Sequence, residues 1–255
     1  MLNYIHSDAK LGRNVVVEPF AVIYDDVEIG DGTWIGPHVT IFPGARIGKN
    51  CKIFPGASVA AIPQDLKFDG EETTAIIGND NIIRESVTIH RGTSASGSTI
   101  IGNGNLLMAY SHVAHDCRVG NHCVFANSAT LAGHVEVGDW AILGGLSAVH
   151  QFVKIGVHAI LQGGVLVDKD VPPFVKAARF PASYAGINSI GLRRRNFSVE
   201  IINTIQDIYR ILFQSDLKRA DAIAEIANFP QSEERDAILD FIRNSERGLM
   251  RGYKE

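Results

Sequence analysis

Aliphatic residues recur at every sixth position along most of the first two thirds of the chain. Positions in this register are aliphatic, apart from one phenylalanine, over residues 5–59, 77–89 and 101–167, with interruptions at Asp65, Glu71 and Ala95. An α-helix turns by about 100° per residue, so six residues carry a side chain about 120° away from its starting direction. The pattern therefore excludes a helix for this part of the chain.

A triangular coil of three short parallel strands explains the repeat. Each hexad forms one side of the coil, with its aliphatic side chain pointing inwards and a small residue near the corner. Successive coils then stack at the strand spacing of about 4.8 Å. We therefore predict an all-β fold, a parallel β-helix, over residues 1–171, with loops at 65–76 and 94–100 where the register is interrupted.

The hexad pattern ends at Pro172 and Pro173, and the chain then changes character. Ser198 can cap a helix whose apolar residues recur on one face. The expected helices cover about 198–213, 217–228 and 233–249. We predict that residues 172–255 form an α-helical domain that covers the open end of the prism or packs beside it, because an uncapped coil leaves strand edges unpaired.

Composition and charge narrow the class of protein. Among 255 residues, 45% are hydrophobic and 20% are charged, which is typical of a folded chain. The net charge of −4 argues against a nucleic-acid partner, because that function needs a cationic surface. No apolar run approaches the roughly 20 residues of a membrane span, and the first residues do not resemble a signal peptide. We expect a cytoplasmic protein.

Three cysteines, Cys51, Cys117 and Cys123, all fall in the small inward slot of the hexad. They cannot all pair, and their spacing does not match a zinc site. We expect them to fill the core of the prism in a reducing compartment and to bind no metal.

All nine histidines occupy outward slots, which is partly expected for a polar ring, but the clustering of five of them suggests chemistry. With three hexads per coil, His115, Gly133 and Gln151 stand in one column on consecutive coils, and His134 and His150 lie beside it. A neutral imidazole at His115 can take a proton from a hydroxyl near neutral pH. The backbone N–H of Gly133 is approachable and suits an oxyanion.

The sequence resembles a known family in five segments. The segments are Ile89-His90-Arg91-Gly92-Thr93, Ser111-His112-Val113-Ala114-His115-Asp116-Cys117, Ala129-Thr130-Leu131-Ala132-Gly133-His134, Ala148-Val149-His150-Gln151-Phe152 and Gly191-Leu192-Arg193-Arg194-Arg195. They are similar to segments of the bacterial UDP-N-acetylglucosamine acyltransferases, which open lipid A biosynthesis. The resemblance covers nearly the whole chain, including the helical tail.

The resemblance implies a homotrimer of left-handed β-helices with active sites between subunits. It also implies transfer of an (R)-3-hydroxyacyl group from acyl carrier protein to the glucosamine 3-OH of UDP-N-acetylglucosamine. The acyl chain is then carried on the phosphopantetheine of the carrier, and no further cofactor is expected.

The resemblance also implies roles for individual residues. His115 is the general base, Asp116 orients it, and the Gly133 N–H stabilises the oxyanion. The implied substrate contacts are Asp65, Lys67, His112, His134, His150 and Gln151 for the sugar and acyl group, Gly163 for acyl length, and Asn188, Arg194 and Arg195 for the nucleotide. One position departs from the family, where a glutamate is frequent and this chain has Ile190.

Alternatives remain open at this level. The same prism is used by γ-type carbonic anhydrases, which hold zinc with three histidines, but their pair of histidines five residues apart is missing here. A non-catalytic scaffold built from the same repeat is a third class. A related enzyme that acylates a 3-amino sugar, or that uses a CoA donor, fits the same residues.

Overall fold

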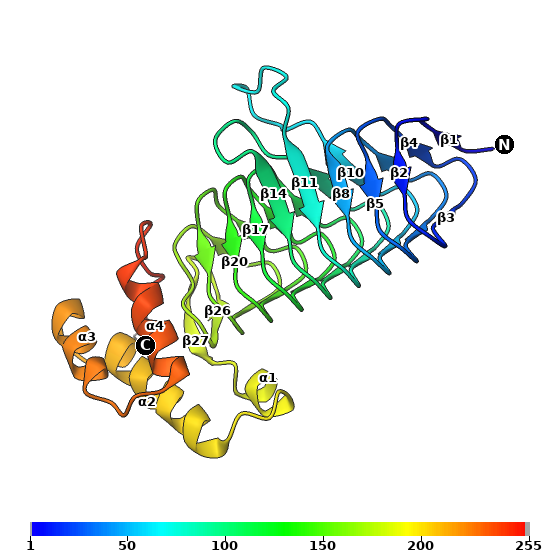
Figure 1. The fold of residues 1–255 in the computed structure, drawn as a ribbon. Coiled ribbons are helices and arrows are strands. Elements are labelled where there is room, and N and C mark those ends of the chain that lie inside the picture. Colours follow the sequence, from blue (N-terminus) through cyan, green and yellow to red (C-terminus); the bar gives the residue numbers. More distant parts are fainter. Residues whose placement is uncertain (1, 253–255) are drawn as a thin grey trace.

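Short parallel strands wind into a triangular prism that is followed by helices, in a computed structural model that describes residues 2–252 (Figure 1). Within this range the prism has three sheets, one for each side. The first has nine strands: β1 (Tyr4–Ile5), β4 (Val22–Ile23), β7 (Thr40–Ile41), β10 (Ser58–Ala61), β13 (Thr88–His90), β16 (His112–Val113), β19 (Thr130–Leu131), β22 (Ala148–Val149) and β25 (Leu166–Val167).

The other two sheets follow the same pattern. In the described part of the chain the second sheet has eight strands: β2 (Lys10–Leu11), β5 (Glu28–Ile29), β8 (Ala45–Ile47), β11 (Thr74–Ile77), β14 (Ser98–Ile101), β17 (Arg118–Val119), β20 (Glu136–Val137) and β23 (Lys154–Ile155). The third has ten over the same residues: β3 (Val16–Val17), β6 (Trp34–Ile35), β9 (Lys52–Ile53), β12 (Ile82–Ile83), β15 (Leu106–Leu107), β18 (Val124–Phe125), β21 (Ile142–Leu143), β24 (Ile160–Leu161), β26 (Val175–Ala178) and β27 (Ser183–Ile187).

The inward residues of the hexads form the core, as predicted. Where no loop intervenes, neighbouring coils pair residues 18 apart, as in Ile142 with Ile160, so identical slots stack along the prism. The inward residues from Ile23 to Val167 are buried. Only the first coil differs, because no coil stacks on its outer side, and Ile5 is 37% exposed. The parallel β-helix inferred from the period of six is confirmed.

Both predicted loops leave the same corner of the prism, where the first sheet passes into the second. We call this the first–second corner and name the other two corners in the same way. Both loops lie three residues earlier in the chain than expected, between Ala61 and Thr74 and between His90 and Ser98. The strands that follow them, β11 and β14, pair along four residues, from Thr74 with Ser98 to Ile77 with Ile101, so strand pairing continues into the interrupted hexads.

The third sheet extends past residue 171, where the hexad pattern ends. Strand β26 pairs in parallel with β24, and β27 then pairs antiparallel with β26. The two prolines shift the register but do not end the sheet, which hexad counting alone could not detect. The division into domains at residues 171 and 172 stays a prediction, and residues 1 and 253–255 of the predicted ranges lie outside the described residues.

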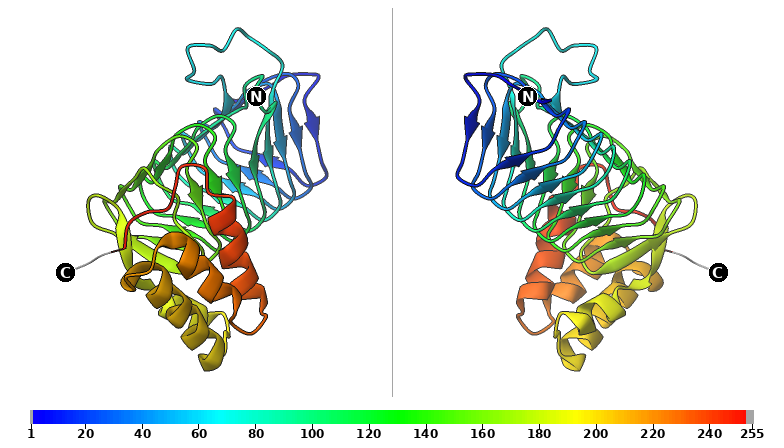
Figure 2. Two further views of the ribbon diagram at one scale, coloured as in Figure 1. Left: turned by 90° about the vertical axis from the view of Figure 1, so that its left-hand side faces the viewer. Right: turned by 90° about the vertical axis from the view of Figure 1, so that its right-hand side faces the viewer.

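The helices lie at the C-terminal end of the prism and beside its last coils (Figures 1 and 2). They are α1 (Ser189–Arg194), α2 (Val199–Gln214), α3 (Arg219–Ala227) and α4 (Glu233–Arg243). The Ser198 side chain caps α2 as predicted. Helix α4 is shorter than expected, because the following segment returns to the prism and Leu249 pairs with Asp170. The short helix α1 was not predicted.

Buried hydrogen bonding fixes the helices to the prism. The hydroxyl of Tyr209, on α2, donates to the Pro173 carbonyl oxygen at 2.6 Å.

The three cysteines are free and buried, and burial raises the pKa of Cys117 and Cys123 to about 12. No helix between residues 2 and 252 combines the length and apolar character needed to cross a membrane.

Candidate active site

The predicted column of His115, Gly133 and Gln151 forms at the first–second corner. Strands β16, β19 and β22 pair in the 18-residue register, so the turns that follow them stack. The His134 N–H donates to the His115 carbonyl oxygen at 3.0 Å, and the Phe152 N–H donates to that of Gly133 at 3.1 Å. Both predicted loops leave from this corner and lie beside the column.

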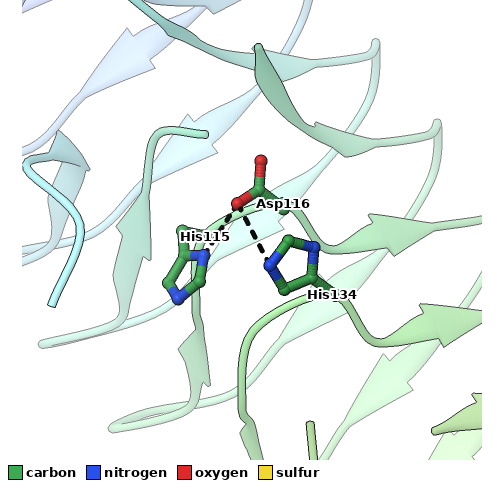
Figure 3. A group of neighbouring side chains, drawn as sticks. All are labelled: His115, Asp116 and His134. Carbon is green, nitrogen blue, oxygen red and sulfur yellow. Dashed lines mark hydrogen bonds and ion pairs between the residues drawn. The ribbon is translucent and has the colours of Figure 1, made fainter. Parts of the chain in front are cut away.

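Corner geometry brings His115 and Asp116 together. Successive side chains of a strand point to opposite faces, but Asp116 has a φ of 60°, in the left-handed region that non-glycine residues rarely adopt. The turn leaves the carboxylate Oδ2 only 2.7 Å from Nδ1 of His115. Figure 3 shows the pair, with His134 Nε2 3.6 Å from the same oxygen. With Nδ1 protonated and donating to Asp116, Nε2 of His115 is free to accept a proton.

The second loop supplies further donors to Asp116. Its carboxylate accepts the Thr93 N–H at 3.0 Å, the Thr93 hydroxyl at 2.7 Å, and the Ser96 hydroxyl. The Thr99 hydroxyl accepts the Asp116 N–H. Burial by itself raises the pKa of this carboxyl, but hydrogen bonds from Ser96, His115 and Thr93 outweigh it and lower the pKa to about 2. Asp116 is therefore a buried anion at neutral pH.

Thr93 and Ser96 were not among the predicted site residues. The available signal was the second interruption of the hexads, which predicted a loop at this place but not its contacts.

Gly133 leaves room for the imidazole. A Cβ at this position would lie 2.5 Å from Cε1 and 2.7 Å from Nε2 of His115, closer than real contacts allow. Gly133 is buried, and its backbone N–H has no acceptor within residues 2–252. An N–H group without a partner in the chain is a candidate donor to a bound ligand.

Further predicted residues surround the column. The ring of His134 stacks on Phe152, with centroids 4.6 Å apart, and burial lowers the pKa of His134 although the Asp116 charge opposes this. His112 Nδ1 lies 2.7 Å from the Thr88 hydroxyl oxygen, and burial, followed by the influence of His115, lowers its pKa. These imidazoles are therefore neutral at physiological pH.

The remaining predictions at this corner concern polar side chains nearer the surface. His150 is exposed, and its Nδ1 lies 3.1 Å from the carbonyl oxygen of the half-buried Gln151. In the first loop, Asp65 accepts the backbone N–H of Lys67 at 3.0 Å. The Asp65 charge also acts to raise the pKa of His134, against the larger effect of burial.

The structure separates the other predicted residues from this corner. At the second–third corner, the Arg195 guanidinium carbon lies 5.1 Å from the centre of the Trp140 ring, and Nη2 donates to the Trp140 carbonyl oxygen at 3.2 Å. Arg194 is exposed beside it on α1. Gly163 lies at the third–first corner and is exposed. One chain therefore does not bring all the predicted residues together.

Asn188 has a structural contact of its own. It is buried, its Nδ2 donates to the His158 carbonyl oxygen at 2.8 Å, and its Oδ1 accepts the Gly191 N–H at the start of α1. Both ends of the amide are engaged within the chain, so a contact between Asn188 and a nucleotide stays a prediction. Ile190, next to it on α1, is exposed.

Two grooves border the prism. One of about 310 Å³ runs between His150, Leu166 and Phe180 and is mainly apolar. Another of about 510 Å³ lies between the coils and α4, lined by Arg118, Lys154 and other residues outside the predicted site. The lining of the first groove includes His150, the residue before Gln151 of the histidine column.

One cluster in the described part of the chain has ligand atoms close enough for a metal ion, namely His115, Asp116 and His134, whose atoms lie within 4.8 Å of one another. The donor set fits a metal poorly. Both Asp116 oxygens already accept hydrogen bonds, and Nδ1 of His115 is already paired with Asp116. The arrangement matches a histidine base held by a carboxylate.

Comparisons with known proteins show the family of this chain. The model of the family described as Udp N-acetylglucosamine O-acyltransferase, Domain 2, matches residues 170–250, and that of the bacterial transferase hexapeptide (six repeats) matches residues 8–43 and 98–133. A Burkholderia mallei protein named acyl-(acyl-carrier-protein)–UDP-N-acetylglucosamine O-acyltransferase is 46% identical over 201 residues, which cover 76% of this chain and 77% of the relative.

Solved structures match as well. A UDP-N-acetylglucosamine acyltransferase from Bacteroides fragilis superposes with a TM-score of 0.97 at 52% identity, covering 98% of both chains. One from Francisella novicida gives 0.96 at 38% identity, covering 98% of this chain and 92% of that one. The predicted fold class, a left-handed parallel β-helix with a helical C-terminal part, is confirmed.

Proposed function

Since the chain belongs to the family of UDP-N-acetylglucosamine O-acyltransferases, we propose that it transfers an (R)-3-hydroxyacyl chain from acyl carrier protein to the glucosamine 3-OH of UDP-N-acetylglucosamine. This reaction is the first step of lipid A biosynthesis. The observation that carries the proposal is the His115–Asp116 pair, which lies against Gly133, whose N–H has no partner within residues 2–252.

His115 is the general base of the proposed reaction. Its Nε2 takes the proton of the 3-OH as the oxygen attacks the thioester carbonyl. The Gly133 N–H stabilises the negative charge on that carbonyl oxygen. The C–O bond forms, the C–S bond breaks, and the proton passes from His115 to the departing sulfur. Asp116 keeps the proton of His115 on Nδ1 and stabilises the imidazolium that forms.

The residues around the column bind the substrates. Their position at or beside the first–second corner supports contacts of Asp65, Lys67, His112, His134, His150 and Gln151 with the sugar and the start of the acyl chain. The apolar groove beside His150 suits the rest of that chain. The acyl group arrives on phosphopantetheine, so the proposed reaction needs no further cofactor.

We propose that the active enzyme is a homotrimer. The base lies at the first–second corner, Arg194 and Arg195 lie near the second–third corner, and Gly163 lies at the third–first corner. One reaction needs the base, the diphosphate contact and the acyl groove close together. Different corners, contributed by neighbouring chains, must therefore meet at each site. Three prisms around a three-fold axis place corners of neighbouring chains face to face, so each site takes residues from two chains.

The proposed contacts with the nucleotide come from residues of α1 and from residues next to its two ends. An arginine fork matches a diphosphate, which suits Arg194 and Arg195, and Asn188 fixes the start of the helix that carries Arg194. The exposed Ile190 replaces the frequent glutamate of the family at the nucleoside end. We also propose a cytoplasmic location, because the three free, buried cysteines suit a reducing compartment.

Mass spectrometry of reaction products tests the proposal. Purified protein is offered acyl carrier protein loaded with 3-hydroxyacyl chains of different length, together with UDP-N-acetylglucosamine or its 3-amino analogue, and the same chains on CoA in parallel. The expected product is 3-O-acylated UDP-N-acetylglucosamine formed from the carrier-protein donor. Acylation of the amino analogue alone, preference for CoA, or no acylated product would contradict the proposal.

A further inference from the structure

The two loops at the first–second corner are joined to each other by Glu71. Its carboxylate, in the first loop, accepts the backbone N–H of Ser94 in the second loop at 3.0 Å. Its other oxygen accepts the N–H of Asp69 at 2.9 Å. The backbone N–H of Glu71 itself, followed by those of Ser94 and Asp69, lowers the pKa of the Glu71 carboxyl, so the side chain is an anion near neutral pH. The first loop is thus hydrogen-bonded to the second through the charged side chain of Glu71.

The second loop in turn holds the catalytic carboxylate. The Ser96 hydroxyl reaches Asp116 from the solvent side, although Ser96 itself is exposed. Its oxygen also lies 3.0 Å from the Ser98 carbonyl oxygen, but one hydroxyl has one proton and a carboxylate is the stronger acceptor. Thr93 makes two more hydrogen bonds to Asp116 from the other end of the loop.

We propose that Ser96 is a positioning residue for the His115–Asp116 pair and that Glu71 acts through it, so that the loop bearing Asp65 and Lys67 is linked to the orientation of the catalytic base. The inference rests on the proposed function, because Asp65 and Lys67 contact the substrate only in that reaction.

The orientation of the Asp116 carboxylate determines whether it can hold His115. Asp116 can hold the Nδ1 proton of His115 only while Oδ2 faces the imidazole at 2.7 Å. The Ser96 hydroxyl donates to the other oxygen, Oδ1, and therefore opposes rotation of the carboxylate away from His115. Ser96 has no contact with a reacting atom in the proposed mechanism. Its removal should therefore affect the rate and not the binding of substrate.

The kinetic test compares Ser96→Ala with Ser96→Thr, which keeps the hydroxyl. The control is Ser98→Ala, because the Ser98 hydroxyl has no hydrogen-bond partner within residues 2–252. We expect Ser96→Ala to lower kcat about tenfold, the effect of one hydrogen bond to a charged group, with KM for UDP-N-acetylglucosamine nearly unchanged. Ser96→Thr should recover most of the rate, and Ser98→Ala should match wild type.

Glu71→Gln tests the link between the loops, with its exposed neighbour as the control in Glu72→Gln. Glu71→Gln should also lower kcat. Combined with Ser96→Ala, it should cost no more than the larger single change, because both act on one loop. Losses that multiply would overturn the link, and a kcat for Ser96→Ala within about twofold of wild type would overturn the positioning role.

A measurement without turnover separates this inference from the proposed function. The Nδ1 proton of His115, held by Asp116, gives a low-field NMR resonance that disappears as the proton exchanges with water. We expect faster exchange in Ser96→Ala than in wild type and in Ser98→Ala. Unchanged exchange would contradict the positioning role even if acyl transfer is confirmed, whereas faster exchange in a protein that transfers no acyl group would contradict only the proposed function.

Discussion

The backbone of Gly133 lies directly against the imidazole of His115, so that a Cβ at Gly133 would come within 2.7 Å of Nε2. The coil register imposes this contact, because residues 18 apart occupy the same place on successive coils. Glycine at the upper position leaves space for the ring below and keeps its own N–H accessible. The base and the proposed oxyanion donor are thus neighbours as a result of stacking.

Gly133→Ala should therefore inactivate the enzyme without unfolding it. The added methyl group displaces the imidazole, and we expect kcat to fall by about 100-fold or more, the range for loss of a general base. Gly145→Ala is the control, because its tightest Cβ contact is 3.3 Å, to the Asn127 carbonyl oxygen. Kinetics and thermal melting check both variants, and an active Gly133→Ala enzyme would show that this contact is not needed.

Acyl length is expected to depend on Gly163. The left-handed φ of this turn belongs to Gly164, and a Cβ at Gly163 meets only the Gly145 carbonyl oxygen at 3.2 Å, so a side chain fits with a small shift. Extra methylenes are buried at about 0.8 kcal/mol each while the groove stays open. Wild type should prefer donors of about fourteen carbons or more, as the family resemblance implies, and Gly163→Met shorter ones. Competition between donors of different length measures the preference. An unchanged preference in Gly163→Met would mean that another residue determines the accepted acyl length.

The stability of the protein should depend on pH through His158. Burial, followed by the charge of Arg195, lowers the pKa of this imidazole from 6.5 to about 4. Between these values the unfolded chain takes up a proton that the folded chain does not, so stability falls as pH falls from about 6.5 to about 4. His158→Asn removes this contribution, and asparagine tolerates the φ of 57° at this position.

Melting temperatures of wild type and His158→Asn at several pH values check this prediction. The advantage of wild type at pH 7 should shrink as the pH approaches 4. A constant difference over the whole range would mean that the imidazole titrates equally in both states.

Assembly should be required for activity. The side chains of Tyr110, Leu146 and Phe180 are 66%, 72% and 79% exposed in the single chain, which is unfavourable for large apolar groups facing water. We expect a homotrimer by sedimentation at assay concentration, and activity that is lost when the trimer dissociates. A fully active monomer would refute the shared site.

The period of six in the sequence predicted the parts of the structure that depend on residue spacing. The buried core, the coil register and the stacking of His115 with Gly133 all depend on spacing alone. Spacing alone could not predict the contact between His115 and Asp116, which the family resemblance implied, because it requires a left-handed turn that places consecutive side chains on one side. The roles of Glu71 and Ser96 were hidden for another reason, since loop conformation depends on a few polar contacts and has no period.

The central claim, that His115 is the base of an acyl transfer, is tested most directly by His115→Ala. Product formation from a 3-hydroxyacyl carrier-protein donor and UDP-N-acetylglucosamine is measured beside His38→Asn, which changes an exposed histidine far along the prism. We predict that kcat falls by at least about 100-fold in His115→Ala, with assembly and melting nearly unchanged, and stays near wild type in the control. Retention of more than about a tenth of wild-type activity by His115→Ala would contradict the assignment.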